Sequence, residues 1–126
     1  MNQKIEIWNC LTEGEITVQE RNGEQLTLFV NIPWIRSRLK PLGDSFVLTL
    51  TGVKKVDFLN FDGTSSSLSD ELDGGTPVIL STESESMPIS INTMEGTLVL
   101  DYQDINFTLD TGQPISYEEI EKVCFD

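Results

Sequence analysis

Apolar and polar residues alternate along most of the chain, with the period of two that is typical of a β-strand with one buried face. The most apolar stretch is residues 46–61, FVLTLTGVKKVDFLNF, in which every second residue from Phe46 to Leu50 is apolar. Gly52 interrupts the alternation, which resumes at Val56 and ends at the turn signal Phe61-Asp62-Gly63. We therefore expect this stretch to supply central strands that earlier and later strands flank.

Further strands are predicted on both sides of this stretch. Ile5 and Ile7 alternate with their neighbours in a short first strand. Asn22-Gly23 joins two alternating runs and predicts a hairpin over residues 15–32, which Pro33 ends or places at a sheet edge. Later strands are predicted at residues 77–82, 89–91, 98–102 and 105–109, with Glu95-Gly96 as a second hairpin turn and Thr111-Gly112 as the stop.

The residues after position 113 change period. Ser116 and Glu119 have the spacing of a capping box, and Tyr117, Ile120 and Val123 or Cys124 fall on one helical face. This pattern predicts a short C-terminal helix, with an edge strand at residues 122–125 as the alternative. Together with the strands, it predicts one mainly β domain over residues 1–126: an antiparallel sandwich or open barrel of about eight short strands.

The alternation also fails between residues 33 and 41. Trp34, Ile35 and Leu39 could share one face of a helical turn, with Arg36, Arg38 and Lys40 outside, or the segment could be an irregular crossing loop. Bases beside a tryptophan suggest a cation–π or anion-binding site. We favour the structural interpretation, in which the bases pair with surrounding acids and Trp34 fills the core.

Charge is the unusual property of this composition. Eight Lys and Arg against 21 Asp and Glu give a net charge of −13. Residues 1–55 hold seven bases and six acids, a net of +1, whereas residues 56–126 hold one base and 15 acids, a net of −14. This charge disfavours binding to nucleic acid or to an anionic membrane surface. The acidic half could be a solvated surface or a binding face for a basic protein.

The residue types narrow the chemistry further. The absence of histidine removes the commonest general base and most zinc sites. Cys10 and Cys124 are expected to be reduced thiols in or near the core, with a bridge joining the termini as the alternative. No signal-peptide or membrane-spanning run is found, so a cytoplasmic location is expected.

The carboxylates do not form a recognisable catalytic or metal site. Asp70, Glu71 and Asp73, with Asp62 nearby, could ligate Ca²⁺, but the spacing of an EF-hand is missing. Asp101 and Asp104, with Asp110 beyond, could be a glycosidase pair, but turn acids in solvent explain them better. The polar loop 63–76 has no phosphate-loop pattern and no lysine. We therefore expect no enzyme activity, no metal and no cofactor.

Small size, strong acidity and a β-rich domain without a catalytic set lead to one family resemblance. In general character, and in the strand-turn style of residues 43–50 and 56–58, the chain resembles immunity proteins of bacterial polymorphic-toxin systems. The resemblance implies that the chain binds and occludes a cognate toxin, often a basic nuclease, and it assigns no residue a role. The acids in polar loops after the apolar centre, which have no basic neighbours, are the candidate binding residues: Asp70, Glu71, Asp73, Glu83 and Glu85.

Two other classes of function remain open at this point. The chain could be a structural or assembly protein whose β-edges pair between subunits. It could also be a small-ligand-binding β-barrel with a deep pocket.

Overall fold

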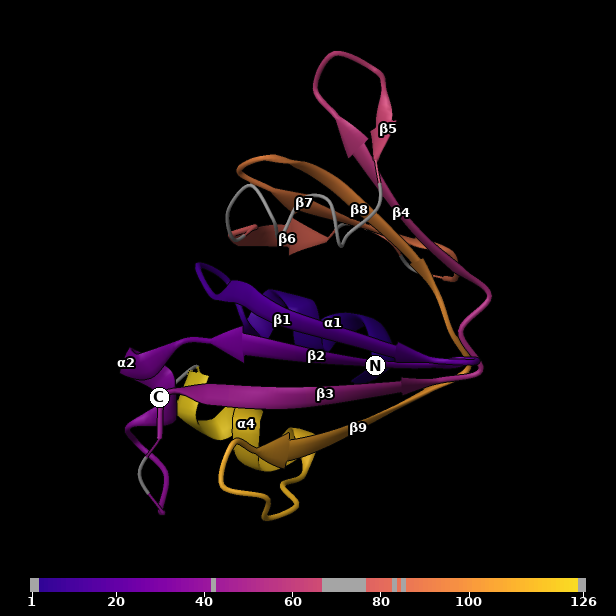
Figure 1. The fold of residues 1–126 in the computed structure, drawn as a ribbon. Coiled ribbons are helices and arrows are strands. Elements are labelled where there is room, and N and C mark those ends of the chain that lie inside the picture. Colours follow the sequence, from indigo (N-terminus) through magenta and orange to yellow (C-terminus); the bar gives the residue numbers. More distant parts are fainter. Residues whose placement is uncertain (1–2, 42, 67–76, 83, 85, 125–126) are drawn as a thin grey trace.

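A computed structural model of the chain describes residues 3–41, 43–66, 77–82, 84 and 86–124. These residues form two antiparallel sheets and three helices in a sandwich-like fold (Figure 1). The first sheet has the order β1 (Glu15–Asn22), β2 (Gln25–Asn31), β3 (Ser45–Thr51), β9 (Asp104–Leu109). The second has the order β5 (Ser65–Ser66), β4 (Lys55–Asn60), β8 (Gly96–Asp101), β7 (Ile89–Thr93), β6 (Ile79–Thr82). The helices are α1 (Gln3–Cys10), α2 (Pro33–Arg36) and α4 (Tyr117–Cys124).

The mainly β fold class is confirmed, and so is the hairpin, which is the pair β1 and β2. The apolar stretch 46–61 does supply inner strands, since β3 lies between β2 and β9 while β4 lies between β5 and β8. Its two halves belong to different sheets, however.

The two sheets are connected by two chain segments that run side by side. β3 continues into β4 through residues 52–54, and β8 continues into β9 through residues 102–103, at the right of Figure 1. Gln103 N–H donates to the Thr51 carbonyl at 2.9 Å, and Lys54 N–H donates to the Asp101 carbonyl at 2.8 Å. The four strands therefore form one long antiparallel ribbon that bends between the sheets.

Gly52 allows this bend. Its φ of 64° lies in the left-handed region, where a side chain is disfavoured. A Cβ at this position would also lie 2.7 Å from the Gln103 side chain. The interruption seen in the hydrophobic pattern is thus the point where the chain leaves one sheet for the other.

The core lies on the inner faces of both sheets and under α1. Leu28, Leu48 and Phe58 have no exposed surface, which is the burial that the alternating pattern predicts. Full burial of one such side chain contributes about 1.5–3 kcal/mol. In the same core the Trp8 indole N–H donates to the Tyr102 hydroxyl at 3.1 Å, which joins α1 to the bend between the sheets.

The prediction of a first strand at Ile5 and Ile7 is wrong, because these residues lie in α1. Ile5 and Trp8 are three residues apart and Ile7 and Leu11 are four apart, and all four are buried. In so short a segment, alternation and helical spacing share the same positions, and packing against β6 and α4 selects the helix.

The C-terminal helix is confirmed as α4. Ser116 Oγ accepts from Glu119 N–H at 3.2 Å, while the Glu119 carboxylate accepts from the Ser116 hydroxyl at 3.1 Å and lies 3.4 Å from its N–H. This is the predicted capping box. The alternative of an edge strand from residue 122 is wrong as far as Cys124, where the described part ends.

Two sheet edges are covered by neighbouring backbone. Next to β6, Glu13 N–H donates to the Ile79 carbonyl at 2.7 Å and Ile79 N–H donates to the Gly14 carbonyl at 2.8 Å. Next to β9, Leu109 N–H donates to the Gln113 carbonyl at 2.8 Å and Ile115 N–H donates to the Phe107 carbonyl at 3.1 Å. These contacts occupy groups that an edge strand would otherwise offer to another chain.

Candidate functional site

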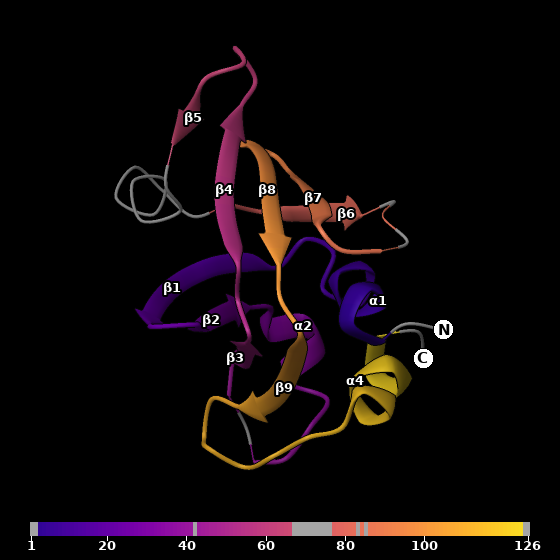
Figure 2. The same cartoon turned by 90° about the vertical axis from the view of Figure 1, so that its right-hand side faces the viewer.

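Exposed apolar side chains gather at one end of the second sheet. Leu59 is 41% exposed, Phe61 78% and Met94 61%. Because Asn60 pairs with Gly96, the turn after β4 and the turn before β8 lie at the same end of the sheet. We call this set the distal surface, and it comprises Leu59, Phe61, Asp62, Met94 and Glu95. Figure 2 shows the turn that joins β4 to β5 projecting away from the helices.

The turn that carries Phe61 is held by its own hydrogen bonds. Asn60 N–H donates to the Thr64 carbonyl at 2.8 Å, and Gly63 N–H donates to the Asn60 carbonyl at 3.0 Å. The Asp62 carboxylate accepts from Thr64 N–H at 2.9 Å and from the Thr64 hydroxyl at 2.6 Å. Gly63 has a φ of 89°, which a hairpin turn of this kind requires at this point. Phe61 is thus fixed in an exposed position by a pre-formed turn.

Carboxylates flank the apolar residues of the distal surface. Hydrogen bonds from the Thr64 hydroxyl and backbone N–H lower the pKa of Asp62, so this side chain stays charged in mild acid. Glu95 is exposed, and its carboxylate accepts from Val78 N–H at 3.0 Å. Lys55 lies at the opposite end of β4, where its ammonium is 3.6 Å from the Asp57 carboxylate. The distal surface therefore combines an aromatic side chain with negative charge.

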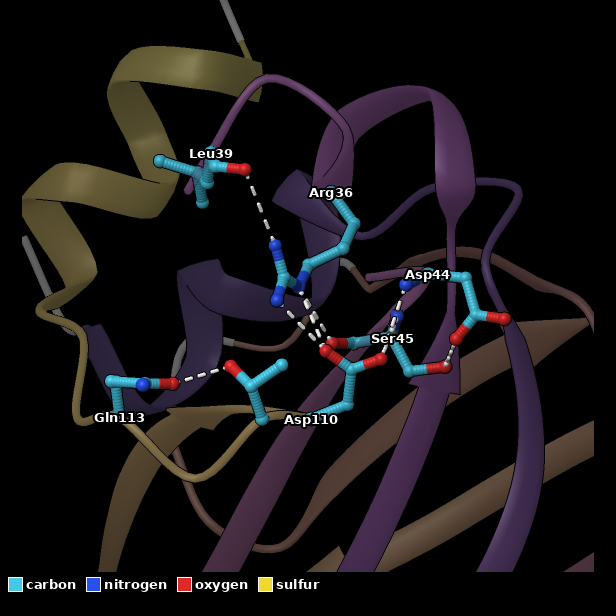
Figure 3. Close-up of polar contacts among 7 residues, drawn as sticks. Arg36, Leu39, Asp44, Ser45, Asp110 and Gln113 are labelled. Carbon is cyan, nitrogen blue, oxygen red and sulfur yellow. Dashed lines mark hydrogen bonds and ion pairs between the residues drawn. The ribbon is translucent and has the colours of Figure 1, made fainter. Parts of the chain in front are cut away.

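A second polar cluster lies inside the molecule, where α2 meets the end of β9 (Figure 3). The Arg36 side chain is fully buried, with Nη2 2.9 Å from Asp110 Oδ1. Arg36 Nε donates to the same carboxylate oxygen at 3.0 Å and to the Ser45 carbonyl at 3.2 Å, and Nη1 lies 3.5 Å from the Leu39 carbonyl.

Asp110 completes this cluster from the other side. Its Oδ2 accepts from Asp44 N–H at 3.1 Å and from Ser45 N–H at 3.3 Å. Partial burial raises the pKa of Asp110, but the Asp44 N–H and the Arg36 guanidinium outweigh burial and hold the pKa below its usual value. The cluster joins the segment before β3 to the end of β9, and its charged groups face one another. We interpret it as a structural connection.

This geometry corrects two predictions for residues 33–41. The segment does begin with a helical turn, α2, but Arg36 is buried inside the molecule. Trp34 is 49% exposed and does not fill the core. The interpretation that the bases pair with acids holds for Arg36, because its contacts with Asp110 and backbone carbonyls compensate for burial of the charge.

Two surface hollows were also found. One, of about 410 Å³, is lined by residues of β9 and of the segment leading into α4, namely 105–108 and 114–118. The other, of about 390 Å³, is lined by Arg38, Leu39, Glu119, Lys122 and Val123. Both lie beside α4, whereas a ligand-binding barrel would hold its ligand between the sheets.

The predicted binding residues Asp70, Glu71, Asp73, Glu83 and Glu85 lie outside the described residues. In sequence, they belong to the connections from β5 to β6 and from β6 to β7, both within the second sheet. Of the other carboxylates considered, Asp104 begins β9 and Asp110 follows its end, so the strand separates them. Within the described ranges, no group of three or more His, Cys, Asp or Glu could hold a metal ion.

Sequence patterns did not identify Phe61 or Met94 as candidate site residues. Phe61 continues an apolar run, and only the Asp-Gly that follows it indicated a turn.

None of the described helices is long and apolar enough to cross a membrane. Comparison with protein-family models, with curated proteins and with solved structures found no match to this chain.

Proposed function

We propose that this chain is a non-enzymatic binding module whose distal surface binds a basic protein and occludes it, as an immunity protein occludes its toxin. The observation that carries this proposal is Phe61, which is 78% exposed on a hydrogen-bonded turn that also carries Asp62, at the same end of the sheet as Glu95. A single exposed apolar residue is ordinary on a protein surface. An aromatic residue fixed in place beside other exposed apolar residues favours a contact surface.

The arrangement matches the anatomy of protein interfaces. Aromatic side chains are enriched where partners bury most surface, and polar residues surround them. Because the Asn60–Thr64 turn is already formed, binding would cost little conformational entropy at Phe61. Asp62 and Glu95 would then meet Lys or Arg side chains at the rim.

The overall charge supports a basic partner. Even if each of the eight bases were paired with one acid, 13 carboxylates would remain. Such an excess attracts a cationic protein from a distance and speeds encounter, and added salt weakens the effect. A toxin that normally binds an anionic substrate would present the complementary surface.

The two alternatives have less support. Assembly through β-edges requires open edges, and the β6 and β9 edges both carry backbone hydrogen bonds to neighbouring segments, which leaves β1 and the two-residue β5 as the edges that such assembly would use. A small-ligand barrel holds its ligand in a pocket between the sheets, and neither of the two hollows described above lies there.

The proposal can be tested by capture followed by titration. The full chain is immobilised, incubated with source-cell lysate at low salt, and eluted with a salt gradient. We expect one dominant basic protein to be released as salt rises. That protein is then purified, and its affinity is measured for the wild type and for variants.

Two sets of variants separate the contact surface from general charge. Phe61→Ala should weaken binding at least about tenfold, as expected for an interface anchor. Lysine substitutions at Asp70, Glu71 and Asp73 should weaken it further and flatten its salt dependence. Lysine substitutions at Glu20, Glu24 and Asp104 change net charge equally but belong to the first sheet and its β1–β2 turn, so they should have a smaller effect. Equal effects of both triple variants, with no effect of Phe61→Ala, would overturn the proposal.

A further inference from the structure

The two cysteines are near opposite ends of the sequence but meet in the folded chain. Cys10 ends α1 and Cys124 ends α4, and Figure 2 shows these two helices next to each other. Cys124 Sγ donates to the Cys10 carbonyl at 3.0 Å, so the Cys124 side chain lies against the residue that carries the other thiol. Both are free thiols, as the sequence-based interpretation expected.

Their surroundings give the two thiols different chemistry. The neighbouring Cys124 side chain lowers the pKa of Cys10 by more than burial raises it, and the neighbouring Tyr117 side chain lowers it further. The same interaction raises the pKa of Cys124, and burial adds to that rise. The lower pKa makes Cys10 the thiol that ionises first. The thiolate is the nucleophilic form of cysteine.

We propose that Cys10 and Cys124 are a redox modification site at which a peroxide forms a reversible disulfide between α1 and α4. The inference rests on the contact of Cys124 Sγ with the Cys10 carbonyl and on the packing of α1 against α4. It is independent of the proposed function, because the distal surface lies at the far end of the second sheet (Figures 1 and 2).

The reaction proceeds in two balanced steps. In the first, the Cys10 thiolate attacks one oxygen of hydrogen peroxide, the O–O bond breaks, and the departing hydroxide takes a proton to leave as water, which gives a sulfenic acid on Cys10. In the second, the Cys124 sulfur attacks the Cys10 sulfur, the S–O bond breaks, and a second water leaves with the Cys124 proton. Two thiols are oxidised and one peroxide is reduced to two waters.

The disulfide would stabilise the folded state by linking the two ends of the fold. It would join residues 10 and 124 and so close nearly the entire chain into one loop. Cross-links that close long loops restrict the unfolded chain most and therefore stabilise the folded state most. Partly exposed Cys124 would give a dithiol reductant access to reverse the bond.

The test uses the purified, reduced full chain, treated with one equivalent of hydrogen peroxide under native conditions at low protein concentration. We expect both thiols to be lost together, the intact mass to fall by two hydrogen atoms, the protein to remain a monomer, and dithiothreitol to restore both thiols. The oxidised chain should also melt at a higher temperature than the reduced chain. A gain of oxygen mass without thiol pairing, a disulfide-linked dimer, or two persistent thiols would overturn the proposal.

Cysteine variants test the order of the two steps. Cys124→Ser, at the partly exposed position, should stop the reaction at a Cys10 sulfenic acid that dimedone traps. Cys10→Ser should leave Cys124 unreacted at the same peroxide dose. If Cys10→Ser fails to fold, the Cys124→Ser trapping result still decides the point, because a chain without dimedone adduct would overturn the assignment of Cys10 as the attacking thiolate.

Discussion

The Arg36–Asp110 cluster and the turn that carries Phe61, which we call the distal turn, both use an aspartate as a hydrogen-bond acceptor, but the cluster lies inside the molecule and the turn is exposed. In both, an aspartate accepts backbone N–H groups: Asp110 from Asp44 and Ser45, and Asp62 from Thr64. In the cluster, the carboxylate also faces a buried guanidinium, so its charge is neutralised within the molecule. In the turn, the carboxylate holds a loop that leaves Phe61 in solvent.

The difference shows how to separate a structural polar site from a candidate contact site in this molecule. The cluster has its charges paired, its hydrogen bonds directed inward, and a glycine, Gly43, at which a side chain would have no room. The turn has an exposed aromatic side chain and the carboxylate of Asp62, which forms no ion pair among the described residues. Substitutions in the first region should change folding, whereas substitutions in the second should change binding.

The largest expected loss of stability comes from breaking the Arg36–Asp110 pair. Asp110→Asn would leave the fully buried Arg36 charge without its carboxylate, and we expect the free energy of unfolding to fall by about 3 kcal/mol. Urea denaturation measures this loss. The double variant Arg36→Met/Asp110→Leu should recover most of it, because no charge is then left unpaired. A single variant as stable as Asp57→Asn, which breaks an exposed pair, would contradict this interpretation.

The next largest loss of stability is expected from substitution of Gly43, which lies beside the cluster. A Cβ here would lie 2.2 Å from Asp110 Oδ1 and 2.7 Å from Arg36 Nη2, so the pair would have to move. We expect Gly43→Ala to lower the free energy of unfolding by about 2 kcal/mol, within the usual range for overpacking. Unchanged stability, measured in the same denaturation series, would show that the cluster adjusts to the extra carbon.

The cluster should also make stability depend on pH. The folded state lowers the pKa of Asp110, so the folded carboxyl binds a proton less readily than the unfolded one. The stabilisation is complete above the unfolded pKa, usually 3.8, and is lost as pH falls through the lower folded pKa. Denaturation midpoints measured between about pH 6 and 2 should therefore fall less steeply for Arg36→Met/Asp110→Leu than for the wild type. Parallel slopes would contradict the assignment.

Substitution of Gly63 in the distal turn should lower the free energy of unfolding through backbone strain alone. Gly63 has a φ of 89°, and a Cβ added there would have no atom within 4 Å, so Gly63→Ala meets no steric contact but a disfavoured conformation. We expect a loss of about 1 kcal/mol in the free energy of unfolding. It should also weaken binding of the captured partner, because the turn would present Phe61 less uniformly. Wild-type stability and wild-type affinity together would show that the turn tolerates a side chain.

The smallest effect on folding is expected at Phe61 itself. Because this side chain is 78% exposed, Phe61→Ala should change the free energy of unfolding by less than about 0.5 kcal/mol. Thermal melting measures this, with Phe58→Ala, a fully buried residue of β4, as the destabilised reference. A large loss of stability for Phe61→Ala would mean that the residue packs within the fold and is not presented to a partner.

Local patterns determined much of the fold. Alternation placed most strands, Asn22-Gly23 placed the first hairpin, and Ser116 with Glu119 placed the C-terminal helix. These predictions were confirmed because each depends on interactions among residues close in sequence, or on one buried face. Gly52 was visible as an interruption, but its role as the bend between two sheets was not.

Tertiary structure decided what depends on residues far apart in sequence. The sequence pattern around Arg36 predicts a surface base. Its burial depends on contact with Asp110, which lies 74 residues later in the chain. Ile5 and Ile7 fit a strand or a helix, and packing against β6 and α4 selected the helix. The exposure of Phe61, and its place beside Met94, follow from the pairing of β4 with β8. The sequence by itself determined that this is an acidic, mainly β chain, because composition and alternation are local properties. Which charges are buried, and which apolar residues are exposed, depended on contacts that form only when the sheets assemble.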